Sequence, residues 1–292
     1  MTRRVTSPAR DRVLVDADTV AADLQLGGLQ DPFGGAPLLL DVRWALGRTD
    51  GLDRYEAGHL PGAVYVDLEA ELAAVPSPEA GRHPLPSAAE FQESARGWGV
   101  CSDSRVVVYD EVGGTSAARA WWLLRWFGHD AVRILDGGLE AWRRAGHPLE
   151  VGITRRVPGD MVAHPGGMPV LDADDAADLA TSGVLLDARA AERYRGEVEP
   201  VDPQAGHIPG AVSAPTTENL DDEGAFRSEA ELRARFTSLG VRPDATVGVY
   251  CGSGVTAAHE IAALASIGVP AALYPGSWSQ WSNDPGRPVA VS

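Results

Sequence analysis

Two kinds of hydrophobic pattern alternate along this chain. Two segments, Thr115–Phe127 and Thr256–Ile267, carry apolar residues at helical spacing, and each follows a short apolar run and a tight turn. Short runs that are apolar on both faces indicate buried parallel strands. These runs are Leu38–Val42, Val106–Tyr109, Val132–Leu135, Val184–Asp187, Val247–Tyr250 and Ala272–Tyr274. The order strand, turn, helix predicts α/β domains, each a mostly parallel sheet with helices on both faces.

The chain also repeats itself. GHLPGAV, at Gly58–Val64, returns as GHIPGAV at Gly206–Val212, and other similar segments recur in the same order about 140 to 148 positions apart. Between the copies, Gly146–Pro169 is rich in Pro and Gly and lacks a sustained apolar period, which is typical of a connecting segment. We therefore predict an N-terminal domain over residues 1–155 and a C-terminal domain over residues 156–292.

Composition and charge narrow the possible functions. With 292 residues, of which 44% are hydrophobic, the chain is long enough for two packed domains. Its net charge of -16 is spread along the chain and would repel nucleic acids and anionic membranes. No apolar run approaches the roughly 18 residues of a membrane span. The first residues also lack the apolar core of a signal peptide, so we expect a cytoplasmic protein.

Cys251 is the candidate nucleophile. The chain has two cysteines, which cannot build a disulfide framework and suit a compartment where a free thiol can work. Cys251 follows a strand and begins CGSGVTA, which leads into a helix. The glycines let backbone N–H groups converge on one point, and the helix start adds partial positive charge. Such a turn binds anions and favours a nucleophilic thiolate. Cys101 lacks these surroundings, and we assign it a packing role.

The first copy of the repeat provides an internal comparison. Aligning Tyr109 with Tyr250 places Asp110 where Cys251 stands. The turn after Asp110, DEVGGTSAA, keeps the small residues and the helix entry but has no nucleophile. We therefore expect the first domain to be non-catalytic and to form one wall of an active site in the second.

These features together resemble the tandem rhodanese family, and most closely its 3-mercaptopyruvate sulfurtransferase branch. The resemblance covers nearly the whole chain and rests on YEAGHLPGAV, GHIPGAV, CGSGVTA and YPGSWSQW in this order. It implies that Cys251 takes a sulfane sulfur from a small-molecule donor, holds it as a persulfide and passes it to a small thiol, a thioredoxin-like protein or another nucleophile. No metal or organic cofactor is implied, because the persulfide is the carrier. A tandem pair already supplies both walls of the site, so we expect a monomer.

The resemblance assigns roles within the loop. Ser253 and Thr256 offer hydroxyls that polarise the leaving group or steady the thiolate, although both residue types also suit a turn and a helix cap. The backbone of Gly252, Gly254 and Val255 would meet the substrate. Relatives that use thiosulfate usually carry basic residues after the cysteine, so this uncharged loop favours 3-mercaptopyruvate.

Other substrate-binding residues are implied outside the loop. Arg193 matches the arginine that binds the donor carboxylate, with a surface helix arginine as the alternative. His83 and Glu69 resemble a histidine and an acidic residue that reach in from the first domain, although a solvated loop also suits Glu69. Trp278 would line the pocket or belong to the core. The family's second arginine is missing from EVEPVD, which leaves the carboxylate clamp one arginine short; Arg195 is the nearest substitute.

Three other functions compete with the 3-mercaptopyruvate sulfurtransferase interpretation. A cysteine-dependent phosphatase needs an arginine where this chain has Ala257, which argues strongly against that class. A thiosulfate sulfurtransferase is the nearest rival, and it would turn over thiosulfate and 3-mercaptopyruvate comparably. A non-catalytic binding module would lose nothing on Cys251→Ser, but the intact Cys251 loop argues against it.

Overall fold

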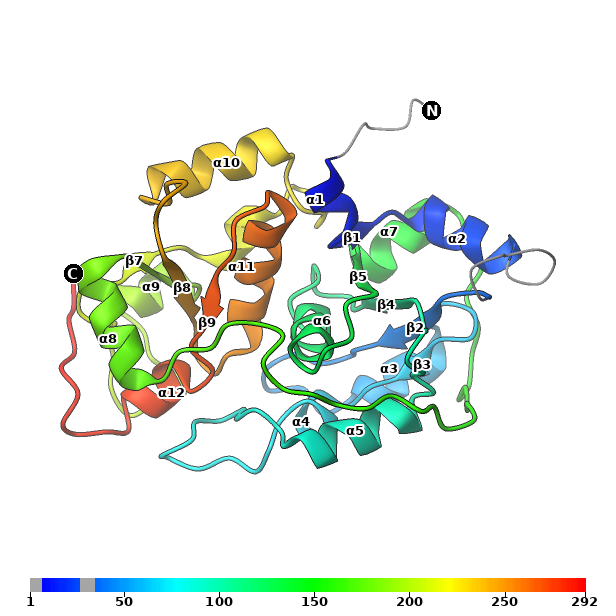
Figure 1. Ribbon diagram of the computed structural model, residues 1–292, viewed down its shortest axis with the longest axis horizontal. Coiled ribbons are helices and arrows are strands. Elements are labelled where there is room, and N and C mark those ends of the chain that lie inside the picture. The colour runs from blue at the N-terminus through cyan, green and yellow to red at the C-terminus, as the bar shows by residue number, and fades with distance from the viewer. Residues whose placement is uncertain (1–6, 27–34) are drawn as a thin grey trace.

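The computed structural model describes residues 7–26 and 35–292; residues 1–6 and 27–34 of the expected first domain lie outside the described residues. Within the described part of the first half, one parallel sheet has the strand order β1-β5-β4-β2-β3 (Figure 1). Its strands are β1 (Leu14–Val15), β2 (Leu38–Asp41), β3 (Val64–Tyr65), β4 (Val106–Tyr109) and β5 (Val132–Leu135).

A second parallel sheet lies in the other half of the chain, with the order β7-β6-β8-β9. Its strands are β6 (Val184–Asp187), β7 (Val212–Ser213), β8 (Val247–Tyr250) and β9 (Ala272–Leu273). All six predicted strands are confirmed to within one residue at each end. The prediction missed β1, β3 and β7, which are edge strands of two residues and carry little pattern; β9, also a two-residue edge strand, was predicted from the run Ala272–Tyr274.

Helices cover both faces of each sheet, which confirms the predicted fold class. In the first half, Leu40 packs toward α5 and α6, whereas its neighbour Leu39 packs toward α2 and α7, because successive strand residues point to opposite faces. The helices of this half are α1 (Pro8–Asp11), α2 (Ala17–Leu26), α3 (Gly51–Ala57), α4 (Leu68–Glu71), α5 (Ala88–Gly97), α6 (Ala117–Trp126) and α7 (Gly138–Arg144). Those of the second half are α8 (Ala173–Ser182), α9 (Ala191–Tyr194), η1 (Thr216–Asn219), α10 (Glu229–Ser238), α11 (Val255–Ser266) and α12 (Ser277–Trp281). None of the helices in the described ranges is long and apolar enough to cross a membrane.

The two halves meet through α6 and α11, which pack against each other (Figure 1). One hydrophobic cluster runs through both helices and reaches both sheets, from Val108 in β4 to Val249 in β8. Each helix directly follows the central strand of its own sheet. The turns that begin at Asp110 and at Cys251 therefore both lie close to the domain interface.

The chain between α7 and α8 contains no helix. It touches the sheets through isolated bridges, between Glu150 and His59 and between Val170 and Leu273. The boundary that we place at residue 155 falls within this segment.

A long loop of the first half, residues 73–87, crosses to the second half. In Figure 1 this cyan loop leaves the first domain between α4 and α5 and passes beside α12. The backbone N–H of Arg82 donates to Ser279 Oγ at 3.0 Å, and Gln280 Nε2 donates to the Glu79 carbonyl at 2.6 Å. The loop is thus held on the second domain at its middle.

Candidate active site at the domain interface

Cys251 sits at the end of β8 in a tight backbone cradle. Its side chain is buried, with the residue 1% exposed, and its Sγ accepts the backbone N–H of Gly254 at 3.1 Å. Gly254 has φ 78°, and a Cβ there would lie 2.8 Å from the Pro275 carbonyl oxygen, so the turn requires glycine. Helix α11 begins at the next residue, Val255, and its N-terminus adds partial positive charge beside the sulfur.

Helix α12 fixes the backbone of the cradle. The N–H of Cys251 donates to Ser277 Oγ at 3.1 Å, while Trp278 N–H donates to the Cys251 carbonyl and Ser279 N–H to the Gly252 carbonyl, both at 2.9 Å. Ser277 has φ 52°, a left-handed conformation that is uncommon for a residue with a side chain. The Ser277 hydroxyl therefore helps to hold the backbone of the nucleophile in position. Sequence reasoning missed this role, although Ser277 lies in the YPGSWSQW motif.

The equivalent turn of the first domain holds a carboxylate. Asp110 is fully buried and accepts hydrogen bonds from backbone N–H groups of the turn and of the start of α6. The donors are Val112 (2.9 Å), Gly114 (2.8 Å), Ser116 (2.8 Å) and Ala117 (2.9 Å). Burial raises the pKa of Asp110 above its usual range, and these hydrogen bonds oppose the rise. The backbone of this turn thus binds an anion in the copy whose turn has no cysteine.

His83 reaches the cradle from the loop of the first domain. Its Nδ1 lies 2.7 Å from Ser253 Oγ, and both residues are buried. Burial, together with the positive charges of Arg119 and Arg82, lowers the pKa of His83 to about 4. The ring is therefore neutral at pH 7 and can exchange a proton with the Ser253 hydroxyl.

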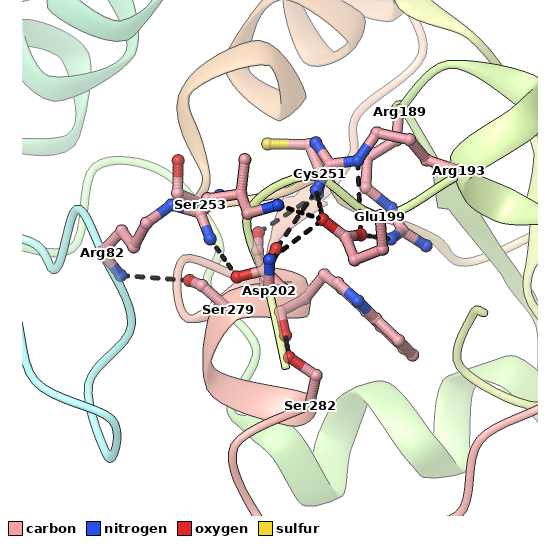
Figure 2. Close-up of polar contacts among 12 residues, drawn as sticks. Arg82, Arg189, Arg193, Glu199, Asp202, Cys251, Ser253, Ser279 and Ser282 are labelled. Carbon is pink, nitrogen blue, oxygen red and sulfur yellow. Dashed lines mark hydrogen bonds and ion pairs between the residues drawn. The ribbon is translucent and has the colours of Figure 1, made fainter. Parts of the chain in front are cut away.

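Arg193 lies beside the Cys251 loop, where a Cβ on Gly252 would be 3.4 Å from its Nη1. Its Nη2 contacts Glu199 Oε1 at 2.7 Å and Asp202 Oδ2 at 3.2 Å (Figure 2). Burial opposes ionisation of Glu199, but hydrogen bonds from the Asp202 backbone and from Arg193 lower its pKa below the usual range. Arg195, in contrast, pairs with the exposed Glu197 at 2.8 Å.

Two further arginines of the first domain approach the cradle. Arg82 forms an ion pair with Asp202 (Figure 2). Arg119 of α6 is fully buried and donates to the carbonyls of Leu72 (3.2 Å), His83 (3.0 Å) and Gly254 (3.4 Å). Burial lowers the pKa of Arg119 to about 10, against the attraction of a charged Cys251, so it stays cationic at pH 7. Sequence reasoning missed both, because no local motif marks a residue that acts across the domain interface.

Comparison with known proteins identifies the family. The Rhodanese-like domain matches residues 25–145 and again residues 172–284, one copy in each half of the chain. The chain belongs to the rhodanese family. This confirms the resemblance inferred from the sequence, and the doubled match agrees with the two sheets of the structure.

Several relatives resemble this rhodanese over most of their length. A Mycobacterium tuberculosis protein named putative thiosulfate sulfurtransferase SseB is 48% identical over 286 residues, covering 96% of this chain and 98% of that protein. A probable 3-mercaptopyruvate sulfurtransferase of Pseudomonas aeruginosa is 49% identical over 261 residues, covering 87% and 92%. The crystal structure of SseA from Escherichia coli, described as a 3-mercaptopyruvate sulfotransferase with the rhodanese fold, superposes with a TM-score of 0.79 at 38% identity, covering 91% and 98%.

The remaining expected site residues lie at different distances from the chemistry. The exposed Glu69 accepts a hydrogen bond from Trp44 Nε1 at 3.1 Å, and the Trp44 ring meets the His83 ring edge-on with centroids 5.4 Å apart. Within the described residues Glu69 and His83 form no hydrogen bond, so the expected pair is linked only through Trp44.

Trp278 and Val255 belong to the core of this rhodanese. The Trp278 ring is fully buried, with the Arg189 guanidinium 4.5 Å above its centroid, so it supports the site from beneath and does not present a face to a donor. The side chain of Val255 is also buried in the core, which leaves its backbone for the cradle. Thr256 is half-buried in the first turn of α11, and in the described ranges its hydroxyl forms no hydrogen bond.

Proposed function

We propose that this rhodanese is a 3-mercaptopyruvate sulfurtransferase that carries the transferred sulfur as a persulfide on Cys251. The proposal rests on the surroundings of Cys251 Sγ, which accepts a backbone N–H of its turn. The guanidinium groups of Arg82 and Arg193 lie against the next residue, Gly252. The residue after that, Ser253, is hydrogen-bonded to His83. A nucleophile, a proton carrier and a site for an anionic donor thus meet at one turn.

The first half-reaction follows from these groups. The Cys251 thiolate attacks the sulfur of HS–CH2–CO–COO⁻, and the carbon–sulfur bond breaks with its electron pair going to carbon. The enolate that leaves takes up one proton and becomes pyruvate, CH3–CO–COO⁻. The donor thiol gives up one proton, so the enzyme retains the anion Cys–S–S⁻ and the overall charge is unchanged.

The neighbouring residues have distinct roles in this step. The Ser253 hydroxyl, backed by the neutral His83, carries the proton from the donor thiol to the enolate. The cradle N–H of Gly254 and the buried cation of Arg119 stabilise negative charge on the sulfur before and after transfer. Arg193 binds the donor carboxylate from the side of Gly252.

Thiosulfate is the second candidate donor, because a specific observation favours it. The loop itself is uncharged, but the guanidinium groups of Arg82 and Arg193 lie against Gly252 and would attract a dianion. From the sequence alone, the uncharged loop argues against thiosulfate. The two nearby arginines weaken that argument.

For the second half-reaction we propose a thiol acceptor, either a small thiol or a thioredoxin-like protein. We also propose that the enzyme is a monomer in the cytoplasm. Attack of the acceptor thiolate on the outer sulfur of Cys–S–S⁻ breaks the sulfur–sulfur bond, and its electron pair returns to Cys251. Reduction by a thiol would thus restore the starting thiolate. Sedimentation of the purified protein measures the oligomeric state.

Intact-mass measurement tests the proposed function. Brief exposure to 3-mercaptopyruvate should add the mass of one sulfur atom, and a reducing thiol should remove it. Cys251→Ser should abolish the gain while leaving the fold intact. A parallel incubation with thiosulfate ranks the two donors. Failure of both donors to add sulfur would contradict the proposal and favour a binding module.

A further inference from the structure

We propose that Asp202, together with Glu199, makes this rhodanese selective for sulfur donors that carry a single negative charge. This inference rests on the proposed function and deepens it, because it names the residues that disfavour thiosulfate, a dianion. Both carboxylates lie in the EVEPVD segment, Glu197–Asp202, which lacks the second arginine of the family. The segment thus brings negative charge to the site instead of positive charge.

The charges beside the nucleophile cancel one another. Arg82 Nη2 and Arg193 Nη1 would lie 2.9 and 3.4 Å from a Cβ on Gly252, so two positive charges border the residue after the nucleophile. Asp202 pairs with both arginines, with Arg82 through Oδ1 and with Arg193 through Oδ2 at 3.2 Å (Figure 2). Glu199 adds a contact to Arg193 at 2.7 Å. Two guanidinium groups and two carboxylates therefore leave no net charge in this cluster.

Two further arginines near the site are matched by anions of their own. Arg189 lies 3.5 Å from Glu199, but it pairs with the buried Asp187 at 2.6 Å. Arg119, further along the turn, compensates the negative charge of the Cys251 thiolate. The first negative charge of a donor can meet the guanidinium nitrogens nearest the turn, whereas a second one finds no surplus of positive charge behind them.

The position of Asp202 is fixed by the surrounding structure. Its side chain is 3% exposed, and its backbone N–H donates to Glu199 Oε1 at 3.0 Å. Two residues later, Gln204 Nε2 donates to the Ser282 carbonyl at 2.7 Å, and the Gln204 carbonyl accepts Trp278 Nε1–H at 2.9 Å. Moving the carboxylates aside to admit a dianion would break these contacts, so the selectivity is built into the resting site.

The test compares Asp202→Asn with the wild-type protein on two donors of nearly the same shape. Thiosulfate, ⁻S–SO3⁻, has two negative charges, whereas methanethiosulfonate, ⁻S–SO2–CH3, has one. With either donor, the Cys251 thiolate attacks the terminal sulfur, and the sulfur–sulfur bond breaks with its electron pair on the leaving sulfite or methanesulfinate. Cyanide then takes the outer sulfur of the persulfide as thiocyanate and restores the thiolate, so one assay gives kcat and KM. 3-Mercaptopyruvate is measured alongside.

Two control variants separate charge from structure. Asp202→Glu keeps the charge, and Glu197→Gln removes a charge from the exposed end of the same segment, where Glu197 pairs with Arg195. Burial raises the pKa of Asp202 above its usual range, but its two arginine partners oppose the rise and favour the ionised carboxylate. Assays at about pH 7 therefore probe its charge.

We expect Asp202→Asn to raise the ratio of kcat/KM for thiosulfate to that for methanethiosulfonate by about 10-fold, mainly through the KM of thiosulfate. The reason is that a unit charge one guanidinium group away repels one more charge on the dianion than on the monoanion. The ratio of thiosulfate to 3-mercaptopyruvate should rise in the same direction. Both ratios should stay within about threefold of wild type in Asp202→Glu and Glu197→Gln.

Two results would overturn the inference. One is a pair of unchanged ratios in Asp202→Asn, and the other is an equal loss on all three donors, which would mean that Asp202 only holds the arginines in place. If Asp202→Asn does not fold, Glu199→Gln removes the other carboxylate and is judged by the same ratios. Absence of a persulfide on the wild type with every donor would contradict the proposed function, whereas a wild type that forms it and unchanged ratios in the variant would contradict only this inference.

Discussion

Arg119 offers a direct test of how the first domain contributes to the chemistry. Replacing it with Met keeps a similar side-chain volume but removes a buried cation and its hydrogen bonds to the Leu72 and His83 carbonyls. Leaving two buried carbonyls without this donor costs roughly 2 to 6 kcal/mol. Burial lowers the pKa of Arg119 to about 10, which corresponds to about 3 kcal/mol of burial cost that the variant relieves. These opposing terms leave the change in unfolding free energy within about 3 kcal/mol, so the Arg119→Met protein should fold.

The loss of the Arg119 positive charge near Cys251 Sγ is not offset in the same way. Arg119 Nη1 lies 3.4 Å from the Gly254 carbonyl, and Gly254 N–H lies 3.1 Å from Cys251 Sγ. Unit charges roughly 6 to 8 Å apart, on the order of the span that one glycine residue bridges, interact by about 2 to 3 kcal/mol at an effective dielectric constant of about 20. Arg119→Met should therefore slow reactions of the Cys251 thiolate at neutral pH by about 100-fold.

Alkylation by iodoacetamide measures this effect, with peptide mapping to separate Cys251 from Cys101. The rate at Cys251 should fall in Arg119→Met at pH 7, whereas the rate at Cys101 should not change. Arg119→Lys, which keeps the charge, should lose much less. An unchanged rate at Cys251 in Arg119→Met, or an equally large loss in Arg119→Lys, would refute the electrostatic reasoning.

Three further predictions concern the remaining groups. The pKa of His83 is about 4 in the folded protein and about 6.5 when unfolded, so the stability that it contributes is complete above pH 6.5 and is lost as the pH falls toward 4, by up to about 3 kcal/mol; urea unfolding at pH 7 and pH 4.5 should show a smaller difference for His83→Gln. Asp110→Ala should leave persulfide formation unchanged but lower the unfolding free energy by about 2 to 4 kcal/mol, because buried N–H groups lose their acceptor, and thermal melts would show this. Glu69→Gln should keep kcat within about threefold of wild type, since Glu69 does not touch His83, and a loss as large as that of His83→Gln in the same assay would contradict this.

Much of the fold could be predicted, because its signals are local. Buried parallel strands such as Val106–Tyr109 and Val247–Tyr250 are apolar at every position, and each repeat copy supports the interpretation of the other. The anion-binding turn was equally visible, since strand, cysteine, glycines and helix are contiguous. Three of the four edge strands, β1, β3 and β7, were not predicted, because strands of two residues that pair on one side need little hydrophobic pattern.

The side chains that act across the interface could not be predicted in the same way. Arg82 and Arg119 lie in segments without a distinctive pattern, and their importance arises only when α6 and the loop 73–87 are placed against the second domain. The role of Trp278, in the core or in the pocket lining, could not be predicted for a related reason. A tryptophan that stacks under Arg189 and one that lines a pocket have the same sequence surroundings, and only packing separates them.

The carboxylate of Asp110 suggests how the nucleophile's turn behaves over a full cycle. The group –CH2–COO⁻ places its terminal atoms as many bonds from the backbone as –CH2–S–S⁻ does, and it is already enclosed by the amides of its turn. The unreactive half of the molecule thus permanently resembles the sulfur-loaded condition of the other half. If the two turns keep the same backbone conformation, addition of the outer sulfur requires no rearrangement around Cys251. The molecule can then alternate between the thiolate and the persulfide without a change of fold.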